Sequence, residues 1–433
     1  MVSVGVIGAG PAGLATARVL VANNKAAKVD LFEASDKVGG VWNYESNTAM
    51  YDVLETNLSN VLMAYEGFPF AGGESRKRFP TRQEVQQYLE SYWESVIKPS
   101  DRVRLFTNTR VTGLEKVGHG WEITGEGEAG VTLHQYDYVV VANGHFSKPF
   151  VPRNIPGLET WPQASQCHSR DYKKCTQFQD LNVVIVGNGS SATDIATQIS
   201  TTARQVYQSV KPDAKTNWPD NSIVEVVSQI ESVAWDRGHS HGSVQLIDGT
   251  VLENIDYIIW ATGFYYDLPF LRNDKYRSDL FRAQGQQKHL YSLYEHIVYT
   301  GDHTLFFSLI PANIVPFPLA ELQACVIDLC IAGRIPESEI VSPAIEEPTS
   351  HFLPTPKDIE YYQHLQGILD KYGAADAADA AFKPRNWTQK WVDERLSSAE
   401  LKAQRQKLLV QWAIAQHARG EPYTLPPGPG PGP

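Results

Sequence analysis

The chain begins with an apolar run, residues 2–7, followed by a glycine-rich turn and then by a segment rich in Ala, Leu and Val. A short apolar run bounded by turn residues is typical of a buried parallel strand, and the segment after the turn has helical character. A further apolar run, residues 29–33, ends in Glu33. The pattern predicts a strand, a turn, a helix and a second strand.

The turn carries the spacing Gly8-x-Gly10-x-x-Gly13. In the dinucleotide-binding fingerprint the first glycine permits the tight turn, the second lets a pyrophosphate approach the backbone, and the third lets helix and strand pack closely. The pyrophosphate lies at the helix N-terminus, where free N–H groups and the helix dipole favour negative charge. Glu33 follows at a distance where an acid can hydrogen-bond a ribose hydroxyl. This unit is predicted to bind an adenine dinucleotide.

The same pattern returns later in the chain. Residues 181–186 form another apolar run, followed by Gly187-x-Gly189, with Ala192 in the third position, and a helix-like segment. Each unit also has a later apolar strand that ends in small residues, at 142–144 and at 261–263. Such duplication predicts two nucleotide-binding units. The expected fold class is α/β with two Rossmann-like dinucleotide-binding domains, an FAD domain with an inserted NADPH domain.

The two units differ in the partner strand of the fingerprint. In the second unit this strand, residues 204–211, ends in neutral and basic residues, where a site for NAD would have Asp or Glu. Ser209 and Lys211, together with Arg204, could bind a 2′-phosphate through charge-assisted hydrogen bonds, although each also fits a solvated surface position. The missing acid favours NADPH in this unit and FAD in the first.

Composition excludes several other functions. The 433 residues contain 38 Lys and Arg against 49 Asp and Glu, and a net charge of −11 disfavours binding to nucleic acid or to anionic membranes. No apolar run is long enough to cross a bilayer, and no signal sequence precedes the first strand. The four cysteines predict reduced thiols in the cytoplasm. A homodimer is left open.

Two dinucleotides predict hydride transfer from NADPH to FAD, so the next electron acceptor decides the class of enzyme. Cys325 and Cys330 have the spacing of the glutathione-reductase pair, but they lie far from the first fingerprint and would point in different directions on a helix. We assign them to packing. Oxygen as acceptor needs a dry pocket, a neutral hydrogen-bond donor and retained NADP⁺. Asn57 is the candidate donor, although an Asn in a loop is also a common turn residue.

Short motifs along the chain resemble those of the flavin-containing monooxygenase family. They occur in order between residue 4 and about residue 334: Gly39-Gly40-Val41-Trp42, Thr56-Asn57, Met63, Phe68-Pro69-Phe70, residues 144–149, Ile155-Pro156-Gly157, residues 168–172, Gly187-x-Gly189-x-Ser191 and Ala261-Thr262-Gly263. The resemblance implies FAD and NADPH as cofactors. It also implies oxygenation of a thioether, thiol or amine at sulfur or nitrogen, through a C4a-hydroperoxyflavin, with O₂ and a small nucleophilic substrate as partners.

The motifs and the resemblance together give a set of expected site residues. Those expected to contact FAD are Gly8, Gly10, Pro11, Ala12, Gly13, Glu33, Gly40, Val41, Trp42 and Val111, with Trp42 also fitting a core position. Thr56 and Asn57 are expected at the flavin–nicotinamide junction, with Asn57 as the catalytic residue. Those expected to contact NADPH are Gly187, Gly189, Ser190, Ser191, Ala192, Thr193, Asp194, Ser209 and Lys211. Thr262 and Gly263 complete the cofactor set, and no metal ligands are expected.

The chain departs from the family signature FxGxxxHxxx(Y/F). His168 and Tyr172 stand in register, but Pro162 and Ala164 replace the Phe and the Gly, and Trp161 lies one place early. Tyr rather than Trp at position 172 resembles the S- and N-oxygenating branch. Baeyer–Villiger oxygenation is the alternative, followed by an NADPH oxidase or a non-catalytic NADPH-binding flavoprotein.

The expected domain order places the NADPH domain inside the FAD domain. Residues 1–165 form the first part of the FAD domain, 166–297 the NADPH domain, 298–424 the second FAD part with C-terminal helices, and 425–433 a disordered Pro/Gly tail. Within the first part, Thr81 and Glu84 form a capping box that predicts the start of an amphipathic helix.

Overall fold

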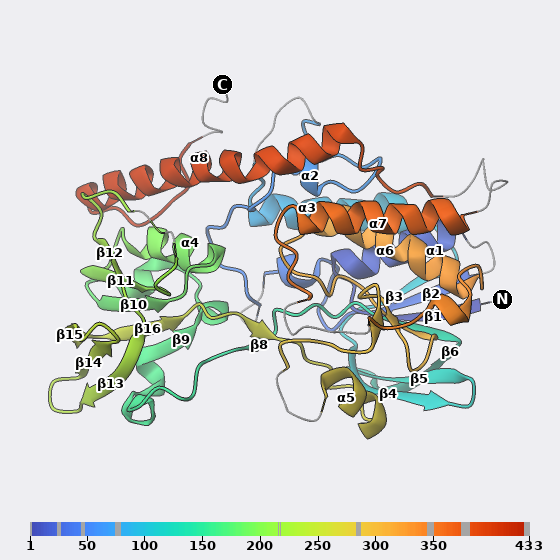
Figure 1. Cartoon of the computed structure of the whole chain (residues 1–433), viewed down its shortest axis with the longest axis horizontal. Helices are drawn as coiled ribbons and strands as arrows, with labels where there is room; N and C mark the ends of the chain where they lie inside the picture. Colours follow the sequence, from blue (N-terminus) through green and yellow to red (C-terminus); the bar gives the residue numbers. More distant parts are fainter. Residues whose placement is uncertain are drawn as a thin grey trace. The chain divides into compact units, whose positions relative to one another are not determined.

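The computed structural model describes residues 2–23, 27–44, 48–73, 79–214, 216, 218–282, 287–343, 350–373 and 382–427. The chain forms two compact units (Figure 1). Unit 1 comprises Met1–Asn43, Leu58–His145 and Tyr265–Ala399; unit 2 comprises Tyr44–Asn57, Phe146–Phe264 and Glu400–Pro433. These boundaries differ from the expected ones, because residues 44–57 and the C-terminal segment pack with the second unit.

Unit 1 is built around a seven-stranded sheet with the order β18-β19-β20-β7-β1-β2-β3. Its strands are β1 (Val2–Ile7), β2 (Ala27–Phe32), β3 (Val103–Phe106), β7 (Tyr138–Val141), β18 (Leu293–Tyr294), β19 (Val298–Tyr299) and β20 (Leu305–Phe307). The strands from β20 to β3 pair in parallel, and β18 and β19 add an antiparallel edge. The predicted apolar strand at the start of the chain is therefore a central parallel strand, buried on both faces.

Helices cover one face of this sheet and an antiparallel sheet covers the other. The helices on the first face are α1 (Pro11–Asn23), α2 (Asn60–Met63), α3 (Arg82–Tyr92), α6 (Pro316–Ile331) and α7 (Lys357–Tyr372), whereas α5 (Asp274–Phe281) packs into the core on the antiparallel side. The covering strands are β4 (Arg110–Val117), β5 (Gly120–Gly127) and β6 (Gly130–Tyr136). Because side chains alternate along a strand, Val140 packs into the helix-side core whereas Val139 and Val141 pack against the antiparallel sheet. The predicted capping box of Thr81 and Glu84 is present at the start of α3.

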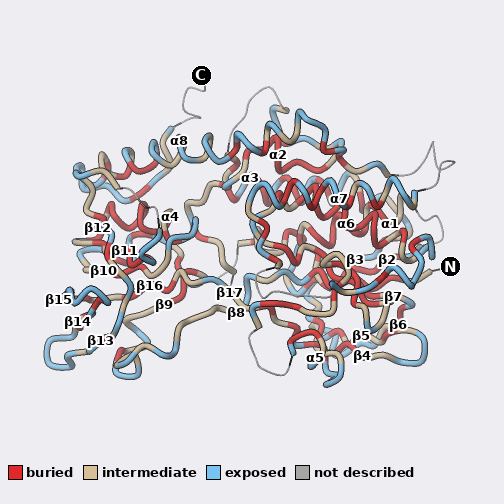
Figure 2. Tube along the Cα trace, viewed as in Figure 1, coloured by how far each residue is buried: buried red, intermediate tan, exposed pale blue. Residues whose placement is uncertain are grey.

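Unit 2 repeats the same three layers around a five-stranded parallel sheet with the order β12-β11-β10-β16-β9. Its strands are β9 (Gln166–His168), β10 (Asn182–Val186), β11 (Gln205–Ser209), β12 (Val224–Val227) and β16 (Tyr257–Trp260), with an antiparallel layer of β13 (Ile230–Asp236), β14 (His241–Leu246) and β15 (Val251–Ile255). Helix α4 (Ser190–Ile199) covers the other face, and the buried strands and helix surfaces are red in Figure 2. The predicted fold class, with two Rossmann-like units, is confirmed.

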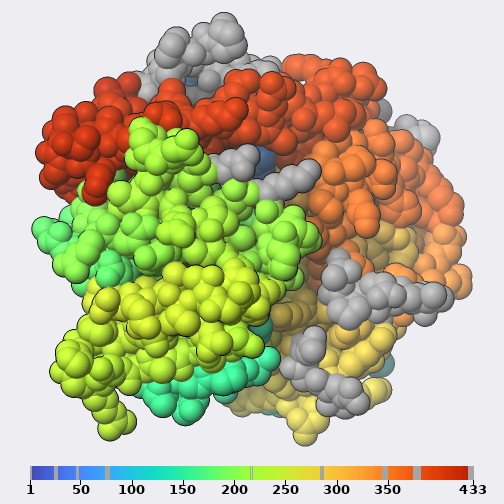
Figure 3. Space-filling model, turned by 60° about the vertical axis from the view of Figure 1, so that its left-hand side comes forward, coloured from blue at the N-terminus to red at the C-terminus, as the bar shows by residue number. Residues whose placement is uncertain are grey.

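The last helix, α8 (Gln389–Arg419), contributes its residues from 400 onward to unit 2. Ala413 and Tyr423 join the core on the α4 side, and Figure 3 shows this red segment lying along the green residues of the unit. Of the predicted disordered tail, residues 428–433 lie outside the described residues, whereas Leu425 packs against this core. No helix in the described part of the chain has both the length and the apolar character needed to cross a bilayer.

The remaining elements are short. Strands β8 (Lys148–Pro149) and β17 (Phe264–Tyr265) pair with each other. Single 3₁₀ turns occur at Gly40–Trp42, Leu158–Thr160, Gln163–Ser165, Ser169–Asp171, Cys175–Phe178 and Glu337–Glu339, and Trp93–Ile97 is a π-helical turn.

Candidate dinucleotide sites

The first fingerprint turn is enclosed by backbone at every glycine. Gly8 has a φ of 106°, and a Cβ atom there would lie 2.5 Å from the carbonyl oxygen of Ala142. A Cβ atom on Gly13 would lie 1.9 Å from the Gly8 carbonyl oxygen, and one on Gly10 would lie 3.3 Å from Gly40 Cα. Any residue other than glycine at these three positions would place its side chain in the space between β1, α1 and the Gly40 turn. This backbone cradle at the start of α1 fits the pyrophosphate of a dinucleotide.

Glu33 is buried at the end of β2 and connects that strand to the turn. The Ala9 N–H donates to Glu33 Oε2 and the Ser35 N–H donates to Glu33 Oε1, each at 2.9 Å. The side chain is thus held at the edge of the turn by two backbone donors. Each carboxylate oxygen has a second lone pair, so the ribose contact expected for Glu33 stays a prediction.

The other residues expected near FAD lie in three elements of unit 1. Pro11 is the first residue of α1, and Ala12 is buried behind it. Val41 and Trp42 belong to the 3₁₀ turn that begins at Gly40, and Trp42 is half-buried against the helix-side core. Val111 lies in β4, and its side chain belongs to the core on the opposite face of the large sheet.

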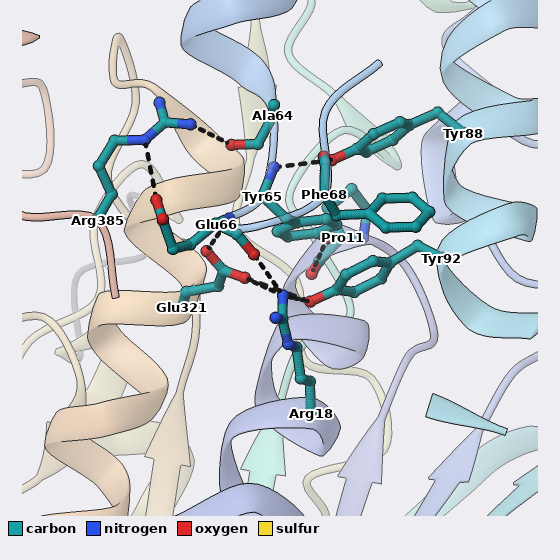
Figure 4. Close-up of polar contacts among 10 residues, drawn as sticks. All are labelled: Pro11, Arg18, Ala64, Tyr65, Glu66, Phe68, Tyr88, Tyr92, Glu321 and Arg385. Carbon is teal, nitrogen blue, oxygen red and sulfur yellow. Dashed lines mark hydrogen bonds and ion pairs between the residues drawn. The ribbon is translucent and has the colours of Figure 1, made fainter. Parts of the chain in front are cut away.

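An aromatic layer that includes Tyr65, Tyr92 and Phe317 contacts the first turn of α1. The Tyr65 ring stacks on Tyr92 at 4.2 Å and on Phe317 at 5.0 Å between centroids. Its hydroxyl donates to the Pro11 carbonyl at 2.7 Å (Figure 4). A pocket of about 370 Å³ lies beside this layer, and Phe68 and Tyr65 contribute to its lining. The layer is therefore a fixed part of unit 1 that supports the backbone at the helix N-terminus.

Two arginines, the half-buried Arg18 and the buried Arg385, hold this layer in place. Arg18 donates to Glu321 Oε1 at 3.1 Å and to the Glu66 carbonyl at 2.9 Å, and the Glu66 N–H donates to Glu321 Oε2 at 2.9 Å. Arg385 donates to the carbonyls of α2's last turn, at 2.8 Å from Ala64 O (Figure 4). Burial raises the pKa of Glu321 to about 7, because desolvation outweighs the nearby Arg18 guanidinium.

The second fingerprint turn repeats the backbone geometry of the first. Gly187 has a φ of 134°, and a Cβ atom there would lie 2.4 Å from the carbonyl oxygen of Ala261. This contact corresponds to the one between Gly8 and the carbonyl oxygen of Ala142 in unit 1. The Gly187 N–H donates to the Ser209 carbonyl at 3.0 Å, as the Gly8 N–H donates to the Phe32 carbonyl at 2.8 Å. The two turns therefore share the same backbone contacts at their first glycine.

The second turn is exposed at Gly189, whereas the equivalent Gly10 of the first turn lies against Gly40. A Cβ atom on Gly189 would meet no described atom within 4 Å, and Ser190 and Ser191 are exposed at the start of α4. No side chain of the described residues caps this helix start. Ala192 is buried and Thr193 is half-buried in the next turn. An exposed helix N-terminus with free N–H groups fits a dinucleotide diphosphate.

The equivalence also identifies the position of the missing acid. Val210 follows Ser209 as Glu33 follows Phe32, and its N–H donates to the Val227 carbonyl at 3.0 Å, as the Glu33 N–H does to the next strand of its own sheet. The acid position of the second unit therefore holds a buried valine. This arrangement lacks the carboxylate that an NAD site uses at the ribose.

The basic residues of this strand lie at opposite ends. Arg204 precedes β11 at the amino end, whereas Lys211 follows its carboxyl end, on the edge of the sheet where the fingerprint turn lies. Ser209 is buried, and its hydroxyl donates to the Ser228 carbonyl at 3.0 Å. Of the three, the exposed Lys211 is therefore the side chain that is available to a 2′-phosphate.

Asp194 points into unit 2, away from the start of its helix. Its carboxylate accepts hydrogen bonds from the Tyr51 hydroxyl and, at 3.2 Å, from Gln198 Nε2. Burial raises the pKa of Asp194. The side chain thus serves to hold residues 48–57 against α4, and its expected contact with NADPH stays a prediction.

The signature histidine connects β9 to the turn after β16. The Arg170 N–H donates to His168 Nδ1 at 3.1 Å, so the Nε2–H is left to donate to the Gly263 carbonyl at 2.9 Å. Burial lowers the pKa of His168 to about 4, which keeps the ring neutral. Thr262 donates to the Phe150 carbonyl. Both Thr262 and Gly263 are therefore fixed at the carboxyl edge of the parallel sheet.

Trp161, which lies one place before Pro162, belongs to the core of unit 2. Its ring is buried in the core beneath β13 and β14, where a Cβ atom on Gly242 would lie 2.4 Å from it. The large ring supplied one position early fills the space against this antiparallel layer.

The candidate catalytic residue lies at the end of the segment that joins unit 2. Asn57 is exposed, whereas the adjacent Thr56 is buried. The side chains that hold this segment, Arg405 and Lys402, are 350 and 346 residues away from their partners and were missed by sequence reasoning. No spacing or periodicity along the chain could have revealed them.

The cysteines, all within the described part of the chain, form no disulfide in the structure. All four are free thiols, and Cys325 and Cys330 both lie on α6, where burial raises the pKa of Cys330 to about 12 and also raises that of Cys325. Protonated thiols are poor nucleophiles, which agrees with a packing role. Among the described residues, no group of three or more His, Cys, Asp or Glu side chains is arranged to hold a metal ion.

Two Rossmann-like units, each with a glycine turn at the carboxyl edge of its sheet, place this protein in the class of oxidoreductases that bind two dinucleotides. Residues 2–225 match the family model described as flavin-binding monooxygenase-like. The chain belongs to this family. It is a monooxygenase, and the membership implies FAD and NADPH as its cofactors.

Individual relatives extend the similarity over the whole chain. A thiol-specific monooxygenase of Saccharomyces cerevisiae is 38% identical over 432 residues, which cover 97% of each chain. The Arabidopsis thaliana flavin-containing monooxygenase FMO GS-OX5 is 32% identical over 77% of this chain and 74% of its own. Among solved structures, S-allyl-L-cysteine S-oxygenase from Allium sativum superposes with a TM-score of 0.69 at 25% identity, covering 96% of this chain and 98% of its own.

Proposed function

We propose that this protein catalyses the NADPH-dependent oxygenation of sulfur in small thiols or thioethers. The observation that carries the proposal is the 38% identity, over 97% of both chains, to a thiol-specific monooxygenase. The similarity to an S-allyl-L-cysteine S-oxygenase supports sulfur over nitrogen as the atom that is oxygenated. Oxygenation of amines is the second candidate within the same chemistry.

In this proposal the two glycine turns bind different cofactors. The enclosed glycines Gly8, Gly10 and Gly13 hold the diphosphate of FAD, and Glu33 holds its ribose. When bound, the flavin supplies the activation of O₂. The open turn at Gly189 receives the diphosphate of NADPH, and Lys211 binds its 2′-phosphate.

Asn57 supplies the hydrogen bond at the reacting oxygen. A neutral carboxamide donates through its NH₂ group without releasing a proton, whereas an acid would promote the loss of peroxide. The substrate sulfur is itself the nucleophile, so the chain needs no nucleophilic side chain or strong base. The exposed position of Asn57, next to the buried Thr56, supports this role because its amide is not committed to the interior.

The test is an NADPH-oxidation assay with parallel detection of oxygenated product and hydrogen peroxide. A small thiol, a thioether, a tertiary amine and a cyclic ketone are compared at equal concentration. We expect product from the sulfur compounds in near-stoichiometric ratio to NADPH oxidised. Product from the ketone instead would indicate a Baeyer–Villiger enzyme, and peroxide with every substrate would indicate an NADPH oxidase. Either result contradicts the proposal.

A further inference from the structure

The segment that carries Asn57 has no helix or strand of its own between Tyr51 and Asn57, and side chains from α4 and α8 bind its backbone. Gln198 Nε2 donates to the Val53 carbonyl at 2.6 Å, and Lys402 Nζ donates to the Thr56 carbonyl at 3.1 Å. Buried carbonyls outside regular structure need such donors. The conformation of this segment is therefore set by residues distant in the sequence.

Arg405 binds the same segment through a buried ion pair. Its Nε donates to Glu55 Oε2 at 2.9 Å and its Nη2 donates to Glu55 Oε1 at 2.5 Å. The side chains are only 11% and 8% exposed, so solvent screens the pair little. A two-pronged contact of this kind fixes orientation as well as distance. It holds the residue two positions before Asn57.

Lys402 binds the chain one residue closer to Asn57 than Arg405 does. The Thr56 carbonyl that it binds belongs to the same planar peptide unit as the N–H of Asn57. Holding that carbonyl fixes the plane from which the Asn57 side chain projects. Burial is the largest influence on the pKa of Lys402 and lowers it, whereas the nearby carboxylates of Asp194 and Glu55 act in the opposite direction.

We propose that α8 positions the Asn57 amide, with Lys402 and Arg405 as its positioning residues. The inference rests on the proposed function of Asn57. It assigns a role to the C-terminal helix, which lies outside the residues matched by the family model. In this reading the helix acts on the chemistry only through the peptide that it holds.

The first experiment measures this effect in the protein without any cofactor requirement. Hydrogen–deuterium exchange is compared for the wild type, Lys402→Met and the control Lys407→Met, which removes the same charge from an exposed position of the same helix. We expect amides of the segment ending at Asn57 to exchange about tenfold faster in Lys402→Met, the effect of losing one charge-assisted hydrogen bond. Lys407→Met should match the wild type.

The second experiment measures coupling, the fraction of oxidised NADPH that appears as oxygenated product. We expect Lys402→Met to release about fivefold more peroxide, and Lys402→Arg to restore most of the coupling because it keeps a cationic donor. In the Asn57→Ala background, Lys402→Met should add nothing, because a residue that acts through Asn57 has no effect once that amide is gone. Arg405→Lys, which keeps the charge but loses the two-pronged contact, is the second variant if Lys402→Met does not fold.

Several results would overturn the inference. Unchanged exchange in Lys402→Met would show that the helix does not hold the segment. Faster exchange with wild-type coupling would reduce the contact to a structural role, as would additive peroxide release in the double variant. Failure of the proposed function looks different, because the wild type would then yield no oxygenated product or Asn57→Ala would remain fully coupled.

Discussion

Replacing Val210 with Glu should shift the second nucleotide site from NADPH toward NADH. Val210 occupies the position that Glu33 has in unit 1, and the two residues are buried to a similar degree, 8% and 6% exposed. The equivalent strand ends are bound to their turns by the same backbone hydrogen bonds. A carboxylate at this position can accept a hydrogen bond from the ribose 2′-OH of NADH and repels a 2′-phosphate.

The magnitude follows from the groups that are gained and lost. A hydrogen bond to a charged group contributes about 1.5–3 kcal/mol, and about 1.4 kcal/mol corresponds to a tenfold change. Lys211→Ala alone should therefore lower kcat/KM for NADPH by about tenfold to a hundredfold and leave the value for NADH nearly unchanged. Adding Val210→Glu should lower the NADPH to NADH ratio by roughly a further tenfold, because the acid acts on both cofactors in opposite directions.

The assay is steady-state oxidation of each cofactor with a thiol substrate, for the two single variants and the double variant. Arg204→Ala is the matched control, because it removes a cation from the other end of the same strand. Arg204→Ala should leave kcat/KM unchanged for both NADPH and NADH. Equal losses for NADPH and NADH in Lys211→Ala, or an unchanged ratio in Val210→Glu, would refute the equivalence of the two strand ends.

Three further predictions concern stability and coupling. Gly13→Ala should lower the free energy of unfolding, measured by chemical denaturation, by about 3 kcal/mol or more, because the new Cβ would lie 1.9 Å from the Gly8 carbonyl oxygen. A loss below about 1 kcal/mol, which is the ordinary difference in helix propensity between Gly and Ala, would contradict this steric argument. The raised pKa of Glu321, about 7, means that the folded state binds more protons than the unfolded state below that pH. The wild type should therefore lose stability as pH rises from about 4.5 to about 7, whereas Glu321→Gln should show a flatter profile, and parallel profiles would contradict this reasoning. Asn57→Ala should keep its FAD absorbance but release peroxide, and wild-type coupling in that variant would exclude the role.

The framework of both units could be predicted from the sequence because local chemistry determines it. Buried strands such as 2–7 and 181–186 show as continuous apolar runs, and the turns need glycine where a Cβ would meet backbone. The structure confirms both elements. The acid position of the second unit was harder to locate, because the end of β11 carries no turn signal; only the pairing of Val186 with Ser209 shows that Val210 is the equivalent of Glu33.

The grouping of residues 44–57 with unit 2 could not be predicted from any local pattern. Its contacts include a side chain that binds backbone, as between Gln198 and the Val53 carbonyl, and a buried ion pair, as between Arg405 and Glu55. Such contacts have no period, and the partners are separated by 145 and 350 residues. Asp194 illustrates the same limit, because its place in the fingerprint does not reveal its hydrogen bonds with Tyr51 and Gln198.

The two turns share one backbone plan, yet they differ in how far they are covered, and this difference bears on how each nucleotide is held. Gly10 is buried against Gly40, and Glu33 is bound by two backbone donors, so a dinucleotide in unit 1 would be enclosed by parts of the chain that are already fixed. Gly189 and Ser190 are exposed, and the acid position is filled by an aliphatic side chain. An enclosed site favours slow dissociation and an open one favours exchange. Under the proposed assignment, the enclosed turn of unit 1 would suit a resident flavin, and the open turn of unit 2 would suit a nicotinamide nucleotide that enters and leaves during turnover.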